Sequence, residues 1–226
     1  MHRILQPVLF LAVICVSGCV APPPVERVLA RVASEPLANA TIIADPKARA
    51  NRSVDSIFVG CNGRQNISRG LVRFDLSSIP ADALIVSATL ELSVLRTRTV
   101  GNPVHLYCLL ESWEEGAMNG DGGGATGSGG PTWVSRSESM GAWSSAGGSI
   151  KADVSASIVM DGPDRYAMDA PTMTADVQGW ISNSGSNHGW LLVGDENTAP
   201  TVKRLGSRLH PDPNMRPALA ITYFVK

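Results

Sequence analysis

Apolar and polar residues alternate without a break from Val86 to Val94. Every even position is Val, Ala or Leu, and every odd position is Ser, Thr or Glu. Successive side chains of a β-strand point to opposite faces, whereas an α-helix would scatter this pattern around its axis. The segment therefore predicts a half-buried strand that turns Leu90 and Leu92 toward a core, and it directs the whole chain toward a β fold.

The same period of two recurs along the chain. In 68–76 it turns Val72 and Phe74 inward and Arg69 and Arg73 outward. Two further inward rows are expected, one at Val104, Leu106, Cys108 and Leu110 and one at Leu219, Ile221 and Tyr223. Shorter strands are expected at Thr41–Ala44, Ser56–Val59, Arg165–Met168, Gly189–Val193 and Lys203–Ser207. Asn62-Gly63 between two of these runs predicts a hairpin turn, because both residues tolerate positive φ.

One segment has helical spacing instead. Met173, Val177, Trp180 and Ile181 are four, three and one residues apart, which predicts a helix of two or three turns with Thr172 or Thr174 as cap. Many short strands separated by turn residues, together with one small helix, predict an all-β protein of the β-sandwich class.

Composition narrows the class of protein. The net charge of −1 and the pI of about 6.4 give no overall attraction to nucleic acid, so no nucleic-acid partner is expected. Charged residues make up only 17 %, and there are 22 glycines, which suits an exported β protein with many turns. The length that remains after the signal allows one domain with a full core or two small domains.

The N-terminus has the layout of an export signal: Arg3 precedes an apolar stretch, 7–16, that is too short to span a bilayer. Val16-Ser17-Gly18-Cys19 resembles a bacterial lipobox, which implies that 1–18 is cleaved and that Cys19 carries a lipid. A plain signal peptide with an incidental cysteine is the alternative. Val20, rather than Asp, follows the cysteine, and by resemblance to known sorting patterns this favours the outer membrane if the host is Gram-negative. We therefore expect a cell-envelope protein whose membrane partner is reached through its lipid.

The domain boundaries follow from the next segment. Residues 19–39 contain the stiff run Ala21-Pro22-Pro23-Pro24 and a short stretch with helical spacing, and they are predicted to form a tether. The folded domain is expected over 40–226. Within it, 116–130 is rich in glycine and lacks an apolar period, so it is predicted to be a protease-sensitive loop.

Cys61 and Cys108 remain after the signal is removed and Cys19 is lipidated. In an oxidising compartment they are either a disulfide or two separately buried thiols. Their long spacing is not that of a metal motif, and the sequence leaves the question of a metal open.

Motifs for catalysis are missing from the sequence: it contains no Gly-x-Ser-x-Gly elbow, no His-Glu-x-x-His helix and no phosphate loop. We therefore predict no cofactor and no enzyme activity. Glu114-Glu115 and Asp195-Glu196 are interpreted as solvated loop charge, with a glycosidase pair drawn from separate segments as the alternative.

Tryptophan and arginine supply the candidate ligand contacts. Trp113, Trp133 and Trp143 border the glycine-rich loop, where an indole either packs the loop down or offers a stacking face to a sugar ring. Arg69 and Arg73 share one strand face about 13 Å apart. They could bind the carboxylates of an acidic polymer, although an ion pair of Arg73 with Asp75 is the structural alternative.

Several motifs resemble the secreted DNRLRE (disaggregatase-related) domain, which is similar in part to carbohydrate-binding module family 96. The segments that carry the resemblance are 70–80, 86–92, 111–116, Thr132-Trp133 with Arg136, Trp143, Gly147-Gly148, 176–180, 187–192, Ser207-Arg208 and 216–223. Leu209 departs from the family, which usually has Glu there, and this puts any contact through that carboxylate in doubt. The resemblance implies a jelly-roll-like β-sandwich.

Members of that family occur beside polysaccharide lyases and hydrolases, and some bind alginate, while others are surface proteins without an assigned ligand. The resemblance therefore implies a module that binds a polysaccharide, either acidic or neutral, through residues drawn from Arg69, Arg73, Trp113, Trp133, Arg136 and Trp143. The alternative is a structural envelope lipoprotein that binds another envelope protein. A polysaccharide-active enzyme is a third, less favoured function. A shared fold alone does not decide among these functions.

Overall fold

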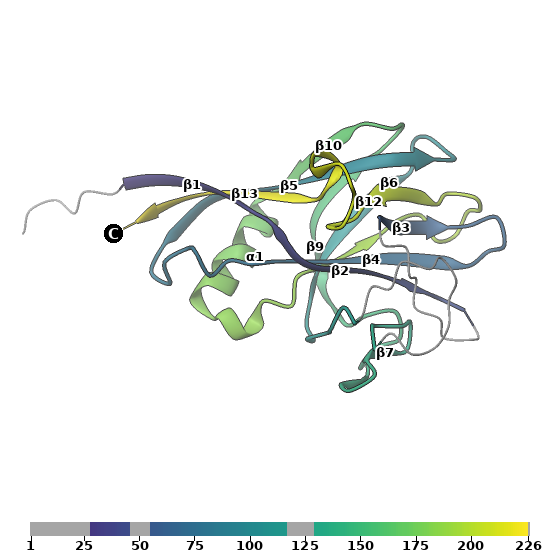
Figure 1. Ribbon diagram of the computed structural model, residues 1–226, viewed down its shortest axis with the longest axis horizontal. Coiled ribbons are helices and arrows are strands. Elements are labelled where there is room, and N and C mark those ends of the chain that lie inside the picture. Colours follow the sequence, from purple (N-terminus) through teal and green to yellow (C-terminus); the bar gives the residue numbers. More distant parts are fainter. Residues whose placement is uncertain (1–27, 46–54, 117–128, 226) are drawn as a thin grey trace, which may run out of the picture.

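The computed structural model describes residues 28–45, 55–116 and 129–225 (Figure 1). Its strands are β1 (Val28–Ser34), β2 (Pro36–Ile43), β3 (Ser56–Cys61), β4 (Ile67–Phe74), β5 (Leu84–Thr97), β6 (Pro103–Leu109), β7 (Ser135–Ser137), β8 (Gly141–Ala142), β9 (Ile150–Val159), β10 (Arg165–Asp169), β11 (Trp190–Val193), β12 (Lys203–Gly206) and β13 (Ala218–Val225). The α-helix is α1 (Pro171–Ser182), and 3₁₀ turns occupy Ser184–Ser186 and Pro213–Met215. The predicted signal peptide 1–18, the predicted lipid site Cys19 and residues 117–128 of the glycine-rich segment lie outside the described residues.

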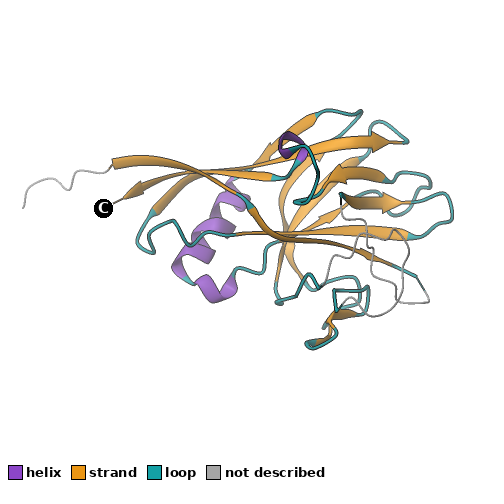
Figure 2. Cartoon of the chain, in the orientation of Figure 1, coloured by secondary structure: helices purple, strands orange, loops and turns teal. Residues whose placement is uncertain are grey.

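The predicted all-β sandwich with one short helix is confirmed. The main sheet is antiparallel, in the order β1-β13-β5-β12-β3-β4-β11-β6-β9, with β10 paired to β5 and β2 paired to β4. It curls so that the layer containing β13 and β5 faces the layer containing β4, β11 and β6 (Figures 1 and 2). The small β7–β8 ribbon lies outside this sheet.

An inner core fills the space between the two layers. Leu90 and Leu92 of β5 are fully buried there, opposite Phe74 of β4 and Trp190 of β11. The helix α1 closes one end and contributes Met173, Val177, Trp180 and Ile181, as its spacing predicts. Neither predicted threonine caps it: Ala170 is the N-cap, without a side-chain hydrogen bond, and Pro171 begins the first turn.

A second, outer cluster lies on the opposite face of the β2–β4–β11 layer. Its buried members are Ala38, Ala40, Ile42, Leu71, Leu109, Trp113, Trp143 and Leu191, with Trp133 packed against them. The described parts of one segment, residues 111–116 and 129–149, supply the tryptophans and cover this face. The layer is therefore buried on both sides, which explains why Leu71 and Val72 are adjacent and both inaccessible.

The N-terminal boundary differs from the predicted tether 19–39. Residues 28–43 form strands β1 and β2 rather than a linker with a short helix. β1 pairs with β13 along its whole length, and Val32 lies opposite Ile221. The partner strand is almost the entire chain away, so tertiary pairing overrides the local helical spacing. The described folded unit begins at Val28, not at residue 40.

Two side chains lie on the unexpected face of their strands. In β5, Thr222 pairs with Ser87 and Tyr223 with Ile85, so Val86 is an inserted bulge residue. Ile85 points inward and Val86 is 48 % exposed. Leu110 is exposed rather than inward because β6 ends at Leu109, which faces the outer cluster.

The predicted hairpin between β3 and β4 is present, but its turn is longer than two residues. The Asn62 side chain accepts hydrogen bonds from the backbone N–H of Arg64 at 2.8 Å and of Asn66 at 3.1 Å. Positive φ occurs at Gln65 rather than at Asn62 or Gly63. In the described part of the chain, no helix has the length and apolar character needed to cross a bilayer.

Candidate ligand-binding site

Two of the candidate tryptophans are part of the outer cluster and have no free face. Trp113 is 1 % exposed and Trp143 is 5 % exposed. Their indole N–H groups donate to backbone carbonyls, that of Trp113 to His188 at 2.9 Å and that of Trp143 to Thr132 at 3.0 Å. Of the two predicted alternatives for these residues, the structure has the packing one, and neither indole is placed to stack on a sugar.

Arg69 is held in place and its charge is already paired. Its guanidinium lies 4.7 Å from the ring centre of Trp133 and donates to both carboxylate oxygens of Glu196, at 2.6 and 2.9 Å. Its Nη1 also donates to the carbonyl of Gly147 at 2.8 Å. Gly147 has φ of +87°, and a Cβ there would lie 2.7 Å from both Arg69 and Trp133. The predicted role of Arg69 as a free ligand contact is therefore not supported.

Glu111 holds the covering segment in place through hydrogen bonds. Its carboxylate accepts hydrogen bonds from the N–H and the hydroxyl of Ser144, both at 2.9 Å, and from the hydroxyl of Ser149. The hydrogen bond from Ser149, more than any other contact, holds the pKa of Glu111 below its ordinary value. The sequence carries no pattern that pairs Glu111 with either serine, so this contact could not be predicted.

Arg136, the third candidate arginine, binds its own ribbon. It donates to the carbonyls of Met140 at 2.5 Å and Ala142 at 3.2 Å, and its Nε lies 3.9 Å from Glu111. These contacts close the β7–β8 turn. Arg136 is therefore a structural residue of the cover.

A second ion pair, between Arg208 and Glu115, stabilises the outer cluster. Arg208 donates through Nη2 to Glu115 at 2.5 Å, and this hydrogen bond raises the pKa of Arg208. Glu115 also accepts from the backbone N–H of Asn39 at 2.9 Å, and the Asn39 side chain accepts from the N–H of Arg208. Glu115 is therefore a paired carboxylate and not solvated loop charge.

Arg73 differs from the other candidate arginines. Its guanidinium lies 5.4 Å from the ring centre of Trp113, and its one hydrogen bond to a described residue, the Trp113 carbonyl, is long at 3.4 Å. Among the described residues no carboxylate lies within ion-pair distance of it. The alternative of an ion pair with Asp75 is not formed, and Asp75 instead accepts from the N–H of Ser77 at 2.9 Å. Burial, opposed by Glu115 and Glu114, lowers the pKa of Arg73.

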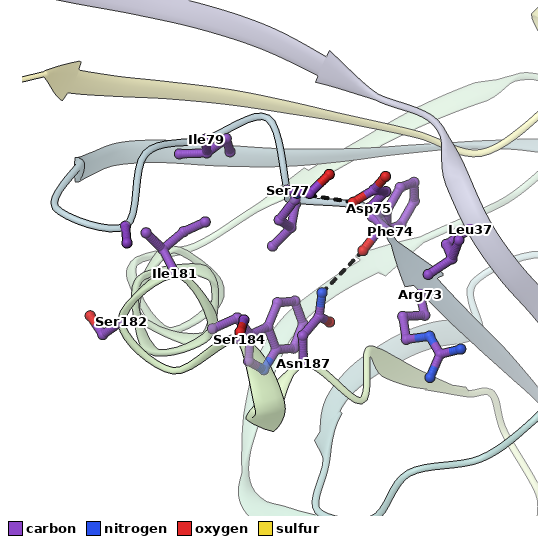
Figure 3. Close-up of a pocket in the computed structure, with 13 residues that line it drawn as sticks. Leu37, Arg73, Phe74, Asp75, Ser77, Ile79, Ile181, Ser182, Ser184 and Asn187 are labelled. Carbon is purple, nitrogen blue, oxygen red and sulfur yellow. Dashed lines mark hydrogen bonds between the residues drawn. The ribbon is translucent and has the colours of Figure 1, made fainter.

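Arg73 stands at the rim of a pocket of about 580 Å³ between the end of β4 and α1 (Figure 3). Leu37, Asp75, Ser77, Ile181 and Asn187 are among its lining residues. Asn187 donates to the carbonyl of Phe74 at 3.0 Å, which fixes the side chain beside the pocket. Two lining side chains carry a buried atom that has no hydrogen-bond partner among the described residues: the donor Nε of Arg73 and the acceptor Oδ1 of Asn187.

Asn187 was not predicted as a site residue, although it stands in the segment 187–192 that carries the family resemblance. The adjacent His188 has a pKa below its ordinary value, mainly because of burial and secondly because of the nearby Arg73 charge. The chain reaches β11 through Gly189, whose φ is +79° and where a Cβ would lie 2.2 Å from the Val72 carbonyl. This close approach sets Asn187 against the end of β4.

Cys61 and Cys108 are both free and buried, so the disulfide alternative is not present and the two separate thiols are. Burial is the main cause that raises the pKa of Cys108 to about 11. Near it, buried Asp176 accepts from Lys151 at 2.8 Å, from Ser155 at 2.5 Å and from the indole of Trp190 at 3.1 Å. In the described ranges no three His, Cys, Asp or Glu side chains are grouped as metal ligands.

Comparison with known proteins adds no family: neither a family model nor a curated protein matches the chain. The resemblance to the DNRLRE domain thus stays a prediction that rests on the motifs quoted above.

Proposed function

We propose that the protein is a lipid-anchored cell-envelope protein whose β-sandwich binds an acidic polysaccharide at the Arg73 pocket. The observation that carries this proposal is the pair of unpartnered polar atoms, Arg73 Nε and Asn187 Oδ1, on side chains that line one pocket. Both atoms are covered by protein in this structure, so a ligand would reach them only after a small shift of the two side chains. It would then recover the free energy that a buried polar group without a partner costs.

The chemistry of these atoms selects the kind of ligand. Arg73 offers a positive charge and a donor, which suit a carboxylate. Asn187 Oδ1 needs a donor, which a sugar hydroxyl supplies. A uronate residue carries both groups on one ring, whereas a neutral glucan provides only hydroxyls. We therefore propose Arg73 and Asn187 as the ligand contacts, in place of the six candidate residues that the sequence suggested.

The anchor and the location are the second part of the proposal. Cys19 is proposed to carry the lipid after cleavage of 1–18, which would hold the module to a membrane, in a Gram-negative host the outer one. Mass spectrometry of the mature N-terminus should find acylated Cys19, and Cys19→Ser should release the protein from membranes. An unmodified soluble form that starts elsewhere would contradict the anchor without bearing on the pocket.

Binding is tested by retention on alginate, pectate and a neutral glucan. We expect retention on the acidic polymers, weaker at physiological than at low ionic strength because salt screens charged contacts. Arg73→Gln should abolish retention. The matched control Arg64→Gln removes the same charge from the exposed hairpin turn and should leave retention unchanged. No retention of either acidic polymer by a folded sample would sink the glycan proposal.

In that event the structural alternative, an envelope lipoprotein that binds another envelope protein, becomes the better proposal. This alternative is favoured because candidate ligand residues make contacts inside the molecule. Trp113 and Trp143 pack in the outer cluster, and Arg69 and Arg136 bind the segment that covers it. Crosslinking in intact cells, followed by identification of the captured protein, would then distinguish a defined envelope partner from none.

A further inference from the structure

β1, β13 and the start of β5 form an arm that extends beyond the body of the sandwich. In Figure 1 the arm runs away from the other strands, and the C-terminal end of β13 lies at its tip beside the start of β1. The strands pair through Leu29 opposite Phe224 and Phe224 opposite Leu84. Directly paired residues share a sheet face, so these three side chains form one row across the arm.

This tip row is apolar and lies outside the buried core, and Leu84 and Phe224 line a hollow beside Gln178 and Ser182 of α1. Leu29 is 59 % exposed and Leu84 is 45 % exposed, while Phe224 is half-buried. The alternate row, Ala30, Tyr223 and Ile85, packs against the inner core instead. Val86, turned outward by the β5 bulge, extends the exposed apolar surface. Neighbouring exposed apolar side chains of this kind mark a surface that contacts a protein or a lipid.

The short length of chain between Cys19 and β1 favours a lipid rather than a protein as the contacted surface. β1 begins nine residues after Cys19, and an extended chain spans at most about 3.3–3.6 Å per residue. A lipid on Cys19 therefore holds the start of β1 within about 30 Å of the membrane. The opposite end of β5 is about 45 Å from Leu84, since β5 has 14 residues at about 3.3 Å each. Among the described residues, the tip row is thus the exposed apolar surface that the chain after Cys19 would keep closest to the bilayer.

We propose that the tip row of Leu29, Leu84 and Phe224 rests on the lipid surface to which Cys19 is attached. The proposal depends on the lipid anchor of the proposed function but not on the polysaccharide pocket. Apolar side chains enter the headgroup boundary favourably, and they add orientation to an affinity that the acyl chains already supply. The sandwich then stands with its arm on the membrane and its β5–β6 end directed away from it.

The test uses the full lipidated protein in phosphatidylcholine and phosphatidylethanolamine vesicles that contain nitroxide-labelled lipid. A bimane fluorophore is attached at Leu84→Cys, or at Val100→Cys, a position 69 % exposed near the far end of β5. Cys61 and Cys108 are buried, and the parent protein without an added cysteine reports any labelling of them. We expect quenching at position 84 to be several-fold stronger than at position 100.

Two further variants guard the interpretation. Leu29→Cys labels the same row and replaces Leu84→Cys if that variant misfolds. Leu29→Ser should reduce quenching at position 84 while flotation with the vesicles stays complete, because the lipid still anchors the protein.

Equal quenching at positions 84 and 100 in protein that floats with the vesicles would overturn the tip-row contact and leave the anchor intact. In a parallel sample, pyrene replaces bimane at position 84. Excimer emission from this pyrene without lipid quenching would assign the row to a second copy of the chain, and would also overturn the proposal. Protein that fails to float would refute the anchor and the tip-row contact together.

Discussion

The two apolar clusters of the molecule are held in different ways. The inner core lies between two sheet layers and is closed by α1, and its side chains come from regular strands that hydrogen-bond through their backbones. The outer cluster lies under the described residues 111–116 and 129–149, whose only regular strands are the short β7 and β8. That cover is fastened by side chains: Glu111 to two serines, Arg69 to Glu196 and Gly147, and Arg208 to Glu115.

Aromatic content alone therefore does not identify a binding surface. Tryptophan beside arginine is typical of a sugar-binding groove, but here the same pairing fastens a cover to a sheet. The difference between the two clusters also implies that the two regions differ in stability. A segment held by a few charged hydrogen bonds opens more readily than strands at the centre of a sheet.

The largest effect is expected in the inner core. Leu92→Ala removes a fully buried side chain of β5 and leaves a cavity that regular strands cannot easily collapse. We expect the free energy of unfolding to fall by about 2–5 kcal/mol, measured by urea denaturation. Leu110→Ala, at an exposed leucine, is the matched control and should change it by less than about 0.5 kcal/mol. Equal effects of the two substitutions would contradict the placement of the inner core.

A smaller, local effect is expected where the cover meets Arg69. Gly147→Ala places a methyl group against Arg69 and Trp133 in a left-handed backbone conformation. The expected cost is about 1–3 kcal/mol. Gly141→Ala has a similar φ of +76° but nothing within 4 Å of its Cβ, so it isolates the backbone strain from the contact. A cost no larger than that of Gly141→Ala would show that the contact with Arg69 and Trp133 is loose.

The outer cluster should also respond to acid. The pKa of Glu111 is lower in the folded protein than in the unfolded chain, mainly through the hydrogen bond from Ser149. Its stabilising contribution is therefore complete above the unfolded pKa of about 4.3 and is lost as the pH falls through the lower folded value. Glu111→Gln should cost about 1 kcal/mol at neutral pH and remove this part of the acid sensitivity. Identical acid dependence of the variant and the parent would refute the role of Glu111.

The smallest effect on stability is expected at Arg73. It has no carboxylate partner among the described residues, and its contacts are the Trp113 ring and one long hydrogen bond. Arg73→Gln should therefore change the free energy of unfolding by less than about 1 kcal/mol while it abolishes binding. Arg69→Gln should cost more, because it leaves Glu196 unpaired. The opposite order in thermal or urea unfolding would reverse the assignment of the two arginines.

Period-two alternation predicted much of the fold, because it reports directly which face of a strand is buried. Leu90, Leu92, Phe74 and Leu219 are all inward as expected. It failed where the register changes. The bulge at Val86 depends on pairing with β13, which no local pattern of β5 contains. For the same reason β1, whose partner is at the other end of the chain, was assigned to the tether.

The candidate site was less predictable than the fold. The sequence identified Arg69 and Arg73 as residues on one face, but period alone does not say which of them finds a carboxylate. Glu196 is 127 residues from Arg69, and only the tertiary fold brings them together. Asn187 became a candidate only when its position next to Phe74 and Arg73 was known.

Hydrogen exchange of two indole N–H groups tests the separation of the two clusters most directly. The Trp190 indole bonds to Asp176 in the inner core, whereas the Trp143 indole bonds to the Thr132 carbonyl in the outer cluster. Nuclear magnetic resonance can follow both in the parent protein and in Leu92→Ala. We predict that Trp143 exchanges faster than Trp190 in the parent, and that Leu92→Ala accelerates Trp190 while it leaves Trp143 nearly unchanged. Acceleration of both indoles by the same factor would show that the two clusters open together, and would contradict their separate stability.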